Sequence, residues 1–467
     1  MLAPHIYQQR RLDLAARIGQ GLILLPGNGE SPMNYADNTY PFRQDSTFLY
    51  YFGIDRPGLV GLIDAEQGIS YLFGDDYALD WIVWMGPQPL LADLAAQVGA
   101  PQHLGADELS GHLHRAWKQG RKVHYLPPYR AETRHDLHRW LELSPAEVDG
   151  RASKTLVLAV VAQRSIKQAE EIAEMELATR ITGEMHLAAM RMARPGIGEA
   201  AVMAAVHAVP LRYGAQPSFT TICSVRGEVL HNHHYPNTLQ AGQLLLCDAG
   251  AEAPSHYAGD MTRTVPVSGR FDTRQREVYA IVLDAQMQAI AAIAPGVRYK
   301  DIHLLAARRI TEGLQQLGLM QGDVEASLAA GAHALFFPHG LGHMIGLDVH
   351  DMENLGEDHV GYGGELKRSS QFGLRSLRLA RTLEPGFVLT VEPGIYFIPP
   401  LFARWQAEGH CAAFLRYDKI AAYMDFGGIR IEDDCLVTET GYRILGDPIP
   451  KTIEDVEETL AAARSEK

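Results

Sequence analysis

The sequence predicts an α/β protein of two domains, with helices and strands mixed along the chain. Its 467 residues exceed the length of about 300 residues beyond which chains usually divide into domains. Hydrophobic residues make up 46% of the chain and charged residues 21%, which is the composition of a globular protein. A polar junction at residues 149–154 separates an N-terminal domain, residues 1–155, from a C-terminal domain, residues 165–455.

The N-terminal domain is predicted to be an α/β domain. Short apolar runs bounded by turn residues are typical of buried strands. Such runs occur at 22–26 and 60–64, and the aromatic-rich segment 40–53 is expected to enter a further strand. Trp81 and Trp84 are expected in the core or in an interface, with the alternative that Trp84 reaches a substrate pocket. No catalytic constellation is visible in this domain.

The C-terminal domain shows helices and strands in an order that occurs twice. Apolar spacing predicts helices that cover 167–194, 198–213, 273–293 and 300–318. Strands are predicted at 220–225, 244–247, 261–267, 387–391, 394–398 and 428–432. The order suggests two related halves, although no clean sequence repeat is visible. Residues 356–382 and 399–425 are expected to be turn-rich insertions.

Charge and cysteine content exclude several classes of protein. The formal net charge of −14 argues against a general nucleic-acid binder, which needs a basic face. The four cysteines are too far apart for a disulfide framework or a zinc ribbon. No apolar stretch approaches the roughly 20 residues of a membrane helix, and the first residues lack the apolar segment of a secretory signal. The sequence therefore predicts a cytoplasmic protein that binds neither nucleic acid nor membrane.

Residues 339–350 are the most informative stretch of the chain. They contain His339, His343 and His350, separated by three glycines. Glycine loses extra backbone entropy on ordering, so this density is unsuited to a packed helix or strand. A loop that passes close to a metal or a substrate fits the pattern, and a surface loop rich in histidine and glycine is the alternative.

Four acidic residues stand at the ends of predicted strands. Asp248 ends one strand and Asp260 precedes another, so a hairpin could bring both carboxylates to one edge of the sheet. Glu392 is followed by Pro-Gly, which stops its strand, and Glu432 ends the strand at 428–432. Each acid alone could cap a turn or face water. Together with His343 they suggest one site.

The chemistry of such a site points to two cations. Four carboxylates in one cleft repel each other and raise their pKa values, and two divalent ions would cancel that charge. Oxygen ligands with one imidazole suit hard ions such as Mn²⁺. Two ions about 3.5–4 Å apart could share carboxylates and hold a hydroxide as nucleophile. His231, His339 and His350 could then polarise a carbonyl or stabilise an oxyanion.

Six sequence motifs, four in the C-terminal domain and two in the N-terminal domain, form a specific set. In the C-terminal domain these motifs are Phe337-Pro-His-Gly-Leu-Gly-His343, Gly346-Leu-Asp-Val-His-Asp351, Leu389-Thr-Val-Glu-Pro-Gly-Ile-Tyr396 and Gly428-Ile-Arg-Ile-Glu-Asp-Asp434. The N-terminal domain adds Tyr40-Pro-Phe-Arg-Gln44 and Val83-Trp-Met-Gly86. Together these motifs resemble the pita-bread metallopeptidases, in their aminopeptidase P and prolidase branch, and the resemblance covers nearly the whole chain.

The resemblance implies a pita-bread catalytic domain, with a pseudo-symmetric curved sheet flanked by helices, and a homodimer or homotetramer. It implies two divalent metal ions, usually Mn²⁺, held by Asp248, Asp260, His343, Glu392 and Glu432. It implies catalytic roles, next to the substrate or supporting the metal ligands, for His231, His339, His350 and Arg430. The implied reaction is hydrolysis of the bond between an N-terminal residue and a following proline.

The spacing of the two metal aspartates departs from the family pattern. The family usually places them eleven positions apart, whereas Asp248 and Asp260 are twelve apart. An extra residue at a hairpin tip can be absorbed as a bulge, whereas one inside a strand would turn a carboxylate to the other face. Both aspartates are therefore kept as expected ligands.

Two branches of the family remain open as interpretations. The motif at 40–44 favours an aminopeptidase P, which accepts long peptides. The segment 373–378 favours a prolidase, because Arg378 matches the arginine that binds a dipeptide's free carboxylate. Trp84 matches an aromatic residue that reaches the substrate pocket. Aminopeptidase P is placed first, ahead of the prolidase, a non-catalytic binding module and a hydrolase of organophosphate esters.

Overall fold

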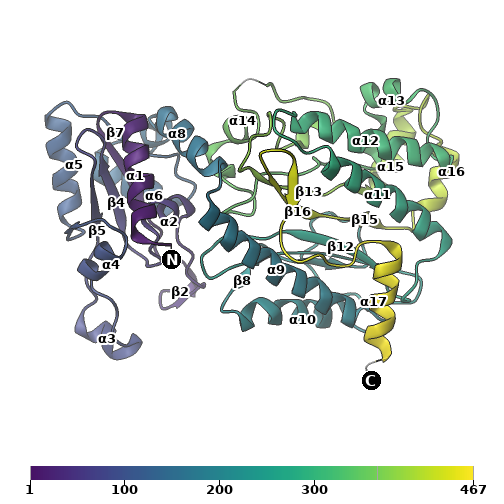
Figure 1. The fold of residues 1–467 in the computed structure, drawn as a ribbon, viewed down its shortest axis with the longest axis horizontal. Coiled ribbons are helices and arrows are strands. Elements are labelled where there is room, and N and C mark those ends of the chain that lie inside the picture. The colour runs from purple at the N-terminus through teal and green to yellow at the C-terminus, as the bar shows by residue number, and fades with distance from the viewer. Residues whose placement is uncertain (1, 365, 466–467) are drawn as a thin grey trace. The chain divides into compact units, whose positions relative to one another are not determined.

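The computed structural model describes residues 2–364 and 366–465 and divides into two compact units (Figure 1). The N-terminal unit runs to Arg164 and includes Met352–His359. The C-terminal unit comprises Ser165–Asp351 and the residues from Val360 on. The predicted domain bounds, 1–155 and 165–455, stay a prediction. No helix in the described part of the chain is long and apolar enough to cross a membrane.

The N-terminal unit is built on a five-stranded sheet in the order β6-β5-β4-β1-β7. Its strands are β1 (Leu22–Pro26), β4 (Val60–Asp64), β5 (Ile69–Phe73), β6 (Gln102–Leu104) and β7 (Val123–His124), with a separate hairpin of β2 (Pro32–Tyr35) and β3 (Asn38–Thr39). Its helices are α1 (Pro4–Ile18), α2 (Ser46–Phe52), α3 (Leu79–Met85), α4 (Leu91–Gln97), α5 (Glu108–Lys118), α6 (Ala131–Leu141), α7 (Pro145–Gly150) and α8 (Lys154–Ser165).

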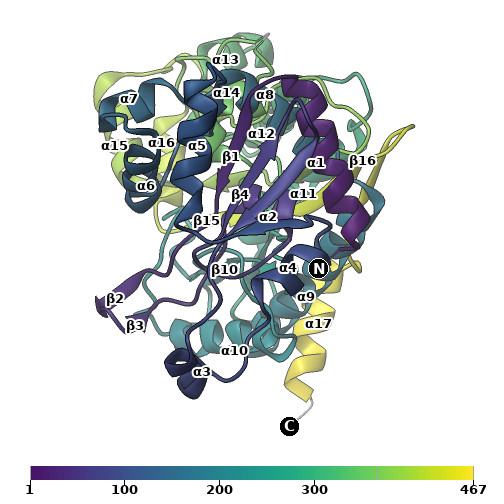
Figure 2. The ribbon, with the colours of Figure 1, turned by 90° about the vertical axis from the view of Figure 1, so that its left-hand side faces the viewer.

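Helices cover both faces of this sheet. Alternate residues of β1 and β4, such as Leu24 and Leu62, pack on apolar residues of α5 to α7, while α1 and α2 contact β4 and β1. Figure 2 shows β1 and β4 between α1 on one side and α5 on the other. The strands predicted at 22–26 and 60–64 are therefore confirmed.

The strand predicted within 40–53 is wrong, because this segment forms helix α2. The side chain of Asp45 accepts a hydrogen bond from Phe48 N at the start of the helix, and Gly53 ends it with a φ of 63°. Caps at both ends outweigh the strand preference of the aromatic residues between them. Trp84 is expected in the core or in an interface, and the core position is wrong, since its side chain lies on helix α3 and is 85% exposed.

The C-terminal unit contains every helix and strand predicted for it, to within a few residues. The helices are α9 (Ala169–Met192), α10 (Glu199–Arg212), α11 (Thr273–Ala291), α12 (Tyr299–Gln316), α13 (Val324–Ala330), α15 (Pro399–Glu408), α16 (Tyr417–Ile420) and α17 (Ile453–Ser465), and α14 (Glu357–Val360) lies at the division between the units. The strands are β8 (Gln216–Pro217), β9 (Ile222–Ser224), β10 (Leu244–Ala249), β11 (Ala251–Glu252), β12 (Met261–Pro266), β13 (Val388–Val391), β14 (Gly394–Tyr396), β15 (Gly428–Arg430), β16 (Asp433–Val437) and β17 (Tyr442–Ile444).

Two helix pairs enclose these strands. Helix α9 packs on α10, and α11 packs on α12. In the view of Figure 1 strands β12, β13, β15 and β16 lie between the two pairs. Within each pair the helices are joined by a Pro-Gly turn in which the glycine, Gly196 or Gly296, has a positive φ, 88° and 83°. This left-handed geometry favours glycine, which explains why the same dipeptide stands at both turns.

The structure reveals an internal repeat that is not apparent in the sequence. Thr238 forms an isolated bridge with Gly198, and Thr382 forms the equivalent bridge with Arg298. Each threonine begins a Thr-Leu-x-x-Gly segment that leads into a strand, β10 or β13. Asp248 and Glu392 stand at the same distance from their threonines. The two halves therefore deliver matching carboxylates at the ends of matching strands.

The second pair of acids also occupies matching positions in the two halves. Asp260 immediately precedes β12, and Glu432 immediately precedes β16. The ladder between β10 and β12 is regular from Leu244 to Ala249, so the extra residue between the two aspartates lies in the hairpin tip. His256 in this tip has a φ of 70°, a conformation that L-residues rarely adopt. The predicted absorption of the extra residue at the tip is thus confirmed.

Candidate active site

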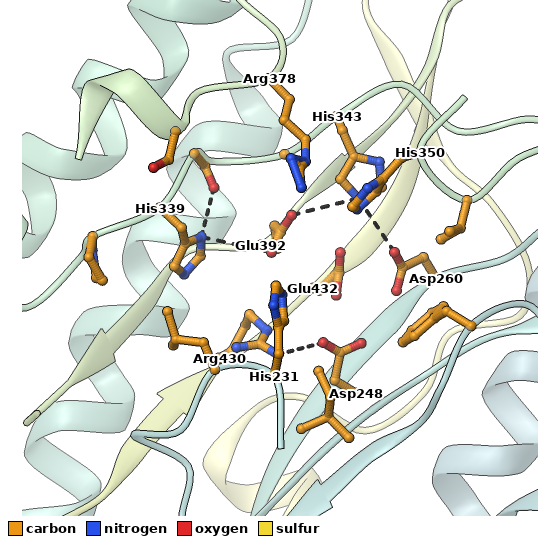
Figure 3. Close-up of a pocket in the computed structure, with 18 of the residues that line it drawn as sticks. His231, Asp248, Asp260, His339, His343, His350, Arg378, Glu392, Arg430 and Glu432 are labelled. Carbon is orange, nitrogen blue, oxygen red and sulfur yellow. Dashed lines mark hydrogen bonds and ion pairs between the residues drawn. The ribbon is translucent and has the colours of Figure 1, made fainter. Parts of the chain in front are cut away.

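Ten of the eleven predicted site residues line one cavity of about 710 Å³ in the C-terminal unit (Figure 3). These residues are His231, Asp248, Asp260, His339, His343, His350, Arg378, Glu392, Arg430 and Glu432. The eleventh, Trp84, belongs to the N-terminal unit. The side chains that line the cavity therefore come mainly from the loop after β9, from β10, from residues 339–350, which we call the histidine loop, and from the ends of β13 and β15.

Backbone contacts hold the carboxylates of the two halves together. Glu432 N donates to Thr262 O at 3.1 Å, and the Thr262 hydroxyl donates to Glu432 Oε2 at 2.7 Å. Thr262 is the register partner of Asp248 across β10 and β12. Strand β12, which pairs with the strand of Asp248, is therefore hydrogen-bonded to Glu432 of the other half.

The histidine loop is tied to strand β13 in the same way. Glu392 N donates to Leu341 O at 2.8 Å, and Thr390 N donates to His343 O at 3.0 Å. A Cβ atom at Gly342 would lie 2.0 Å from Thr390 O, so only glycine permits this approach. The glycine density that marked this loop in the sequence has its physical cause here.

Asp260, His343 and Glu432 can hold a metal ion, because one ligand atom of each lies within 4.8 Å of the others. His343 Nε2 lies 3.5 Å from Asp260 Oδ2 and 3.7 Å from Glu392 Oε1. Asp260 Oδ1 is buried and has no hydrogen-bond donor among the described residues. A buried carboxylate oxygen without a partner is costly, and a cation would satisfy it. The donor set therefore fits a divalent ion.

The pKa values of these groups reflect burial of like charges. Burial and then the charge of Glu432 raise the pKa of Asp260 well above its ordinary value. Burial and then Glu392 raise the pKa of Glu432. Burial raises the pKa of Glu392 to about 8, against the lowering effect of Arg430. Such mutual repulsion is the electrostatic situation that bound cations relieve.

The imidazole of His343 is oriented as a ligand. Burial lowers its pKa well below the ordinary value, so the ring is neutral. Nδ1 lies 3.0 Å from Met344 O, which only a protonated nitrogen can approach as a donor. The Nε2 lone pair is thereby left facing Asp260 and Glu392. A backbone carbonyl that fixes the tautomer in this way is typical of metal-binding histidines.

A buried chain of hydrogen bonds crosses the floor of the cavity. His339 Nδ1 donates to Gly340 O at 2.8 Å, so its Nε2 accepts from the Tyr396 hydroxyl at 2.9 Å. Arg430 Nη1 donates to the same hydroxyl at 2.7 Å, and Arg430 Nη2 donates to Asp248 Oδ2. Burial lowers the pKa of His339 to about 3, which keeps this acceptor nitrogen unprotonated.

The sequence did not predict that Tyr396 takes part in these hydrogen bonds, although Tyr396 ends one of the family motifs. It also missed His233, Arg368 and Arg375, which line the same cavity. His233 could have been found from its place two residues after His231, and the rings of these histidines stack at 6.5 Å. The two arginines lie in the insertion that was expected to be turn-rich, where no periodic pattern marks a side chain as facing a site.

The remaining predicted residues surround the carboxylates. The ring of His350 packs edge-on against His343 at 4.2 Å between centroids. Burial and then the charge of Arg430 lower the pKa of His231. Arg378 enters the cavity from the side opposite Arg430 and Asp248 (Figure 3), and its positive charge, like that of Arg430, opposes the rise in the pKa of Glu392 that burial causes.

Comparison with known proteins identifies the family. Residues 173–439 match metallopeptidase family M24, and residues 7–125 match the N-terminal domain of aminopeptidase P. The chain belongs to metallopeptidase family M24. The resemblance seen in the motifs is thereby confirmed, as is the mixed α/β fold with an aminopeptidase-P-type N-terminal domain.

Relatives of this M24 chain carry two enzyme names. The Xaa-Pro dipeptidase of Homo sapiens is 33% identical over 465 residues, covering 97% of this chain and 91% of that protein. The Xaa-Pro aminopeptidase of Escherichia coli is 32% identical over 482 residues, covering 98% of each. The structure of Escherichia coli aminopeptidase P with the inhibitor Pro-Leu matches with a TM-score of 0.82 at 32% identity over the full length of both chains. Aminopeptidase PepP of Pseudomonas aeruginosa matches with the same TM-score at 29% identity, covering 100% of this chain and 99% of that one.

Proposed function

We propose that this M24 chain is an Xaa-Pro aminopeptidase, which hydrolyses the bond between an N-terminal residue and a following proline. The observation that carries the proposal is the group of Asp260, His343 and Glu432 in the cavity of a chain similar, over almost its whole length, to enzymes named for Xaa-Pro peptides. Peptide hydrolysis needs an activated water and a stabilised oxyanion, and the donors around this cavity suit both tasks.

Five residues are proposed to hold two divalent ions. They are Asp248, Asp260, His343, Glu392 and Glu432, a set of four carboxylates and one imidazole. This donor set favours Mn²⁺ over metals that prefer sulfur or several imidazoles. Ions bound there would polarise the scissile carbonyl and lower the pKa of water.

The protein's own groups are proposed to orient the substrate and its developing charge. His231, His339 and His350 line the cavity together with the carboxylates. His231 and His350 would contact the scissile carbonyl as its oxygen gains negative charge. His339, whose two nitrogens are held by Gly340 O and the Tyr396 hydroxyl, would contact the substrate through its ring. Arg430 fixes Asp248 and the Tyr396 hydroxyl through its two terminal nitrogens, which keeps the carboxylate and His339 in one arrangement.

The alternative is a prolidase, which cleaves only dipeptides, and Arg378 favours it. A guanidinium in the cavity, on the side opposite Arg430 and Asp248, would bind a free carboxylate placed two residues from the N-terminus. The same arginine would disfavour a peptide that continues beyond the proline, because such a peptide carries no free carboxylate at that position.

The test is hydrolysis of Gly-Pro and of a longer Xaa-Pro-Xaa peptide with added Mn²⁺. Wild type, Arg378→Ala and a control, Arg404→Ala, are compared; Arg404 is an exposed arginine of α15 paired with Glu408. Comparable cleavage of the longer peptide, unchanged by Arg378→Ala, supports an aminopeptidase P. Cleavage of the dipeptide alone, weakened by Arg378→Ala and not by Arg404→Ala, supports the prolidase. If neither substrate is cut, the proposal fails in favour of a binding module.

Cytoplasmic location, a homodimeric or homotetrameric assembly and contact of Trp84 with a substrate stay predictions from the sequence. Hydrolysis of organophosphate esters without turnover of either proline peptide would instead favour a hydrolase of such esters.

A further inference from the structure

A buried ion pair lies behind the histidine loop. Lys167 Nζ and Asp351 Oδ2 are 2.8 Å apart, and each side chain is 1% exposed. Withdrawing two charges from water costs several kcal/mol per ion, so such a pair often stabilises a protein no more than a well-packed apolar pair would. An ion pair differs from an apolar pair in being directional, because its hydrogen-bond geometry fixes the distance and angle between two segments.

Lys167 contacts two segments that carry proposed site residues. Its backbone N–H donates to Gly386 O at 2.8 Å, at the entrance to β13 and hence to Glu392. Its side chain reaches Asp351, the residue that follows His350. One residue thus links the start of α9 with both the strand that carries Glu392 and the loop that carries the histidines.

The loop between His343 and Asp351 is folded around the Asp351 carboxylate. Asp351 N donates to Met344 O at 2.9 Å, which closes the loop, and Asp348 N donates to Asp351 Oδ1 at 3.4 Å. A Cβ atom at Gly346 would lie 2.6 Å from Asp351 Oδ2, so the loop leaves room for the carboxylate only because this residue is glycine. The rings of His343 and His350, at the two ends of this loop, are in contact at 4.2 Å.

We propose that Lys167 and Asp351 form a positioning pair, which sets the place of His343 and His350 relative to Glu392. The pair itself lies outside the cavity lining and acts through the loop and through β13. The catalytic consequence rests on the proposed peptidase function, whereas the effect on the position of the histidine rings does not.

The decisive variant replaces both charges by apolar residues of similar volume, Lys167→Met with Asp351→Leu. Removing both charges leaves no unpaired buried ion, so we expect the thermal midpoint of unfolding to stay close to wild type. We expect kcat to fall by about 10-fold or more with little change in KM, because the groups around the reacting carbonyl lose their alignment. The matched control is Arg121→Met with Asp64→Leu, which removes an ion pair of 2.7 Å in the N-terminal unit and should leave kcat unchanged.

A second measurement does not depend on activity. It is an NMR measurement of the imidazole ¹H–¹⁵N correlations of His343 and His350 in the metal-free protein. Single glutamine variants assign the signals, and wild type should show one set of signals for each ring. In the double variant they should broaden or split. If wild type cleaves no proline peptide but these signals change, the proposed function fails and the positioning pair stands.

A third variant covers failure of the double variant to fold. Gly346→Ala would press its Cβ against Asp351 Oδ2 without removing either charge, and it should give the same loss of kcat and the same change in the imidazole signals. Wild-type kcat and wild-type imidazole signals in a folded variant, double or Gly346→Ala, would overturn the proposal.

Discussion

Replacing Tyr396 by phenylalanine tests the chain of hydrogen bonds across the cavity floor. The side chain of Tyr396 is fully buried, and its hydroxyl lies 2.9 Å from His339 Nε2 and 2.7 Å from Arg430 Nη1. Phenylalanine fits the same space but leaves one buried acceptor and one charged donor without this partner. Each such loss costs about 1–3 kcal/mol, and more for a charged group.

The magnitude of the effect on catalysis follows from this loss. Water from the adjoining cavity can replace part of what is lost, so the lower part of the range applies to each atom, and we expect about 2 kcal/mol in transition-state stabilisation. That corresponds to a fall of about 30-fold in kcat/KM. The reason is that His339 and, through Arg430, Asp248 lose a fixed orientation.

The assay compares kcat/KM on an Xaa-Pro peptide with metal content and thermal midpoint. Tyr279→Phe is the control, because Tyr279 is also buried but donates its hydroxyl to Lys451 O at 2.9 Å, and Lys451, unlike His339 and Arg430, does not line the cavity. We expect this control to lose stability and keep its activity. Wild-type kcat/KM in Tyr396→Phe at full metal content would refute the reasoning.

Three further predictions follow from separate contacts. Asp260→Ala should abolish hydrolysis and metal binding together, as judged by turnover and metal analysis, and wild-type turnover would contradict its assignment as a ligand. Gly342→Ala should lower turnover by about 10-fold or more, because its Cβ would lie 2.0 Å from Thr390 O and the loop must move; a crystal structure with an unmoved His343 would contradict this. Burial lowers the pKa of His303 to about 3 and that of His333 to about 4, below the ordinary value of 6.5. Because the unfolded chain then binds protons that the folded chain does not, these two histidines should lower the free energy of unfolding as pH drops from 7 towards 4, by about 2 kcal/mol per histidine at pH 5. His303→Leu with His333→Leu should remove this share of the pH dependence, measured as the difference from wild type in urea titrations at about pH 7 and about pH 5.

The sequence predicted the C-terminal elements well because their signals are local. The helices after residues 167 and 273 and the strands at 244–247 and 261–267 follow from apolar spacing, and Pro-Gly turns mark helix ends. The segment 40–53 was predicted wrongly for the converse reason. Its aromatic residues favour a strand, while the caps at Asp45 and Gly53, one residue each, decide for helix α2.

Residue type, strand ends and the family motifs together nominated ten side chains that line one cavity. The glycine-rich histidine loop and the acids after apolar strands carry their chemistry in the local sequence, and the family motifs fix which of them matter. Their roles as ligands or catalytic groups stay proposals, which the substitutions at Asp260, Arg378 and Tyr396 test.

Contacts between distant segments were decided only by the tertiary structure. Lys167 and Asp351, or Tyr396 and His339, form pairs across long stretches of chain, and no periodic pattern in either segment records the partner. The order of elements suggested two related halves, but which residues correspond was decided by the structure, because the bridges of Thr238 and Thr382 preserve geometry while most of the surrounding residues differ. By itself the sequence determined which donors are available and which strands and loops carry them. Packing of those strands and loops determined which donors meet, because burial and distance depend on the whole fold.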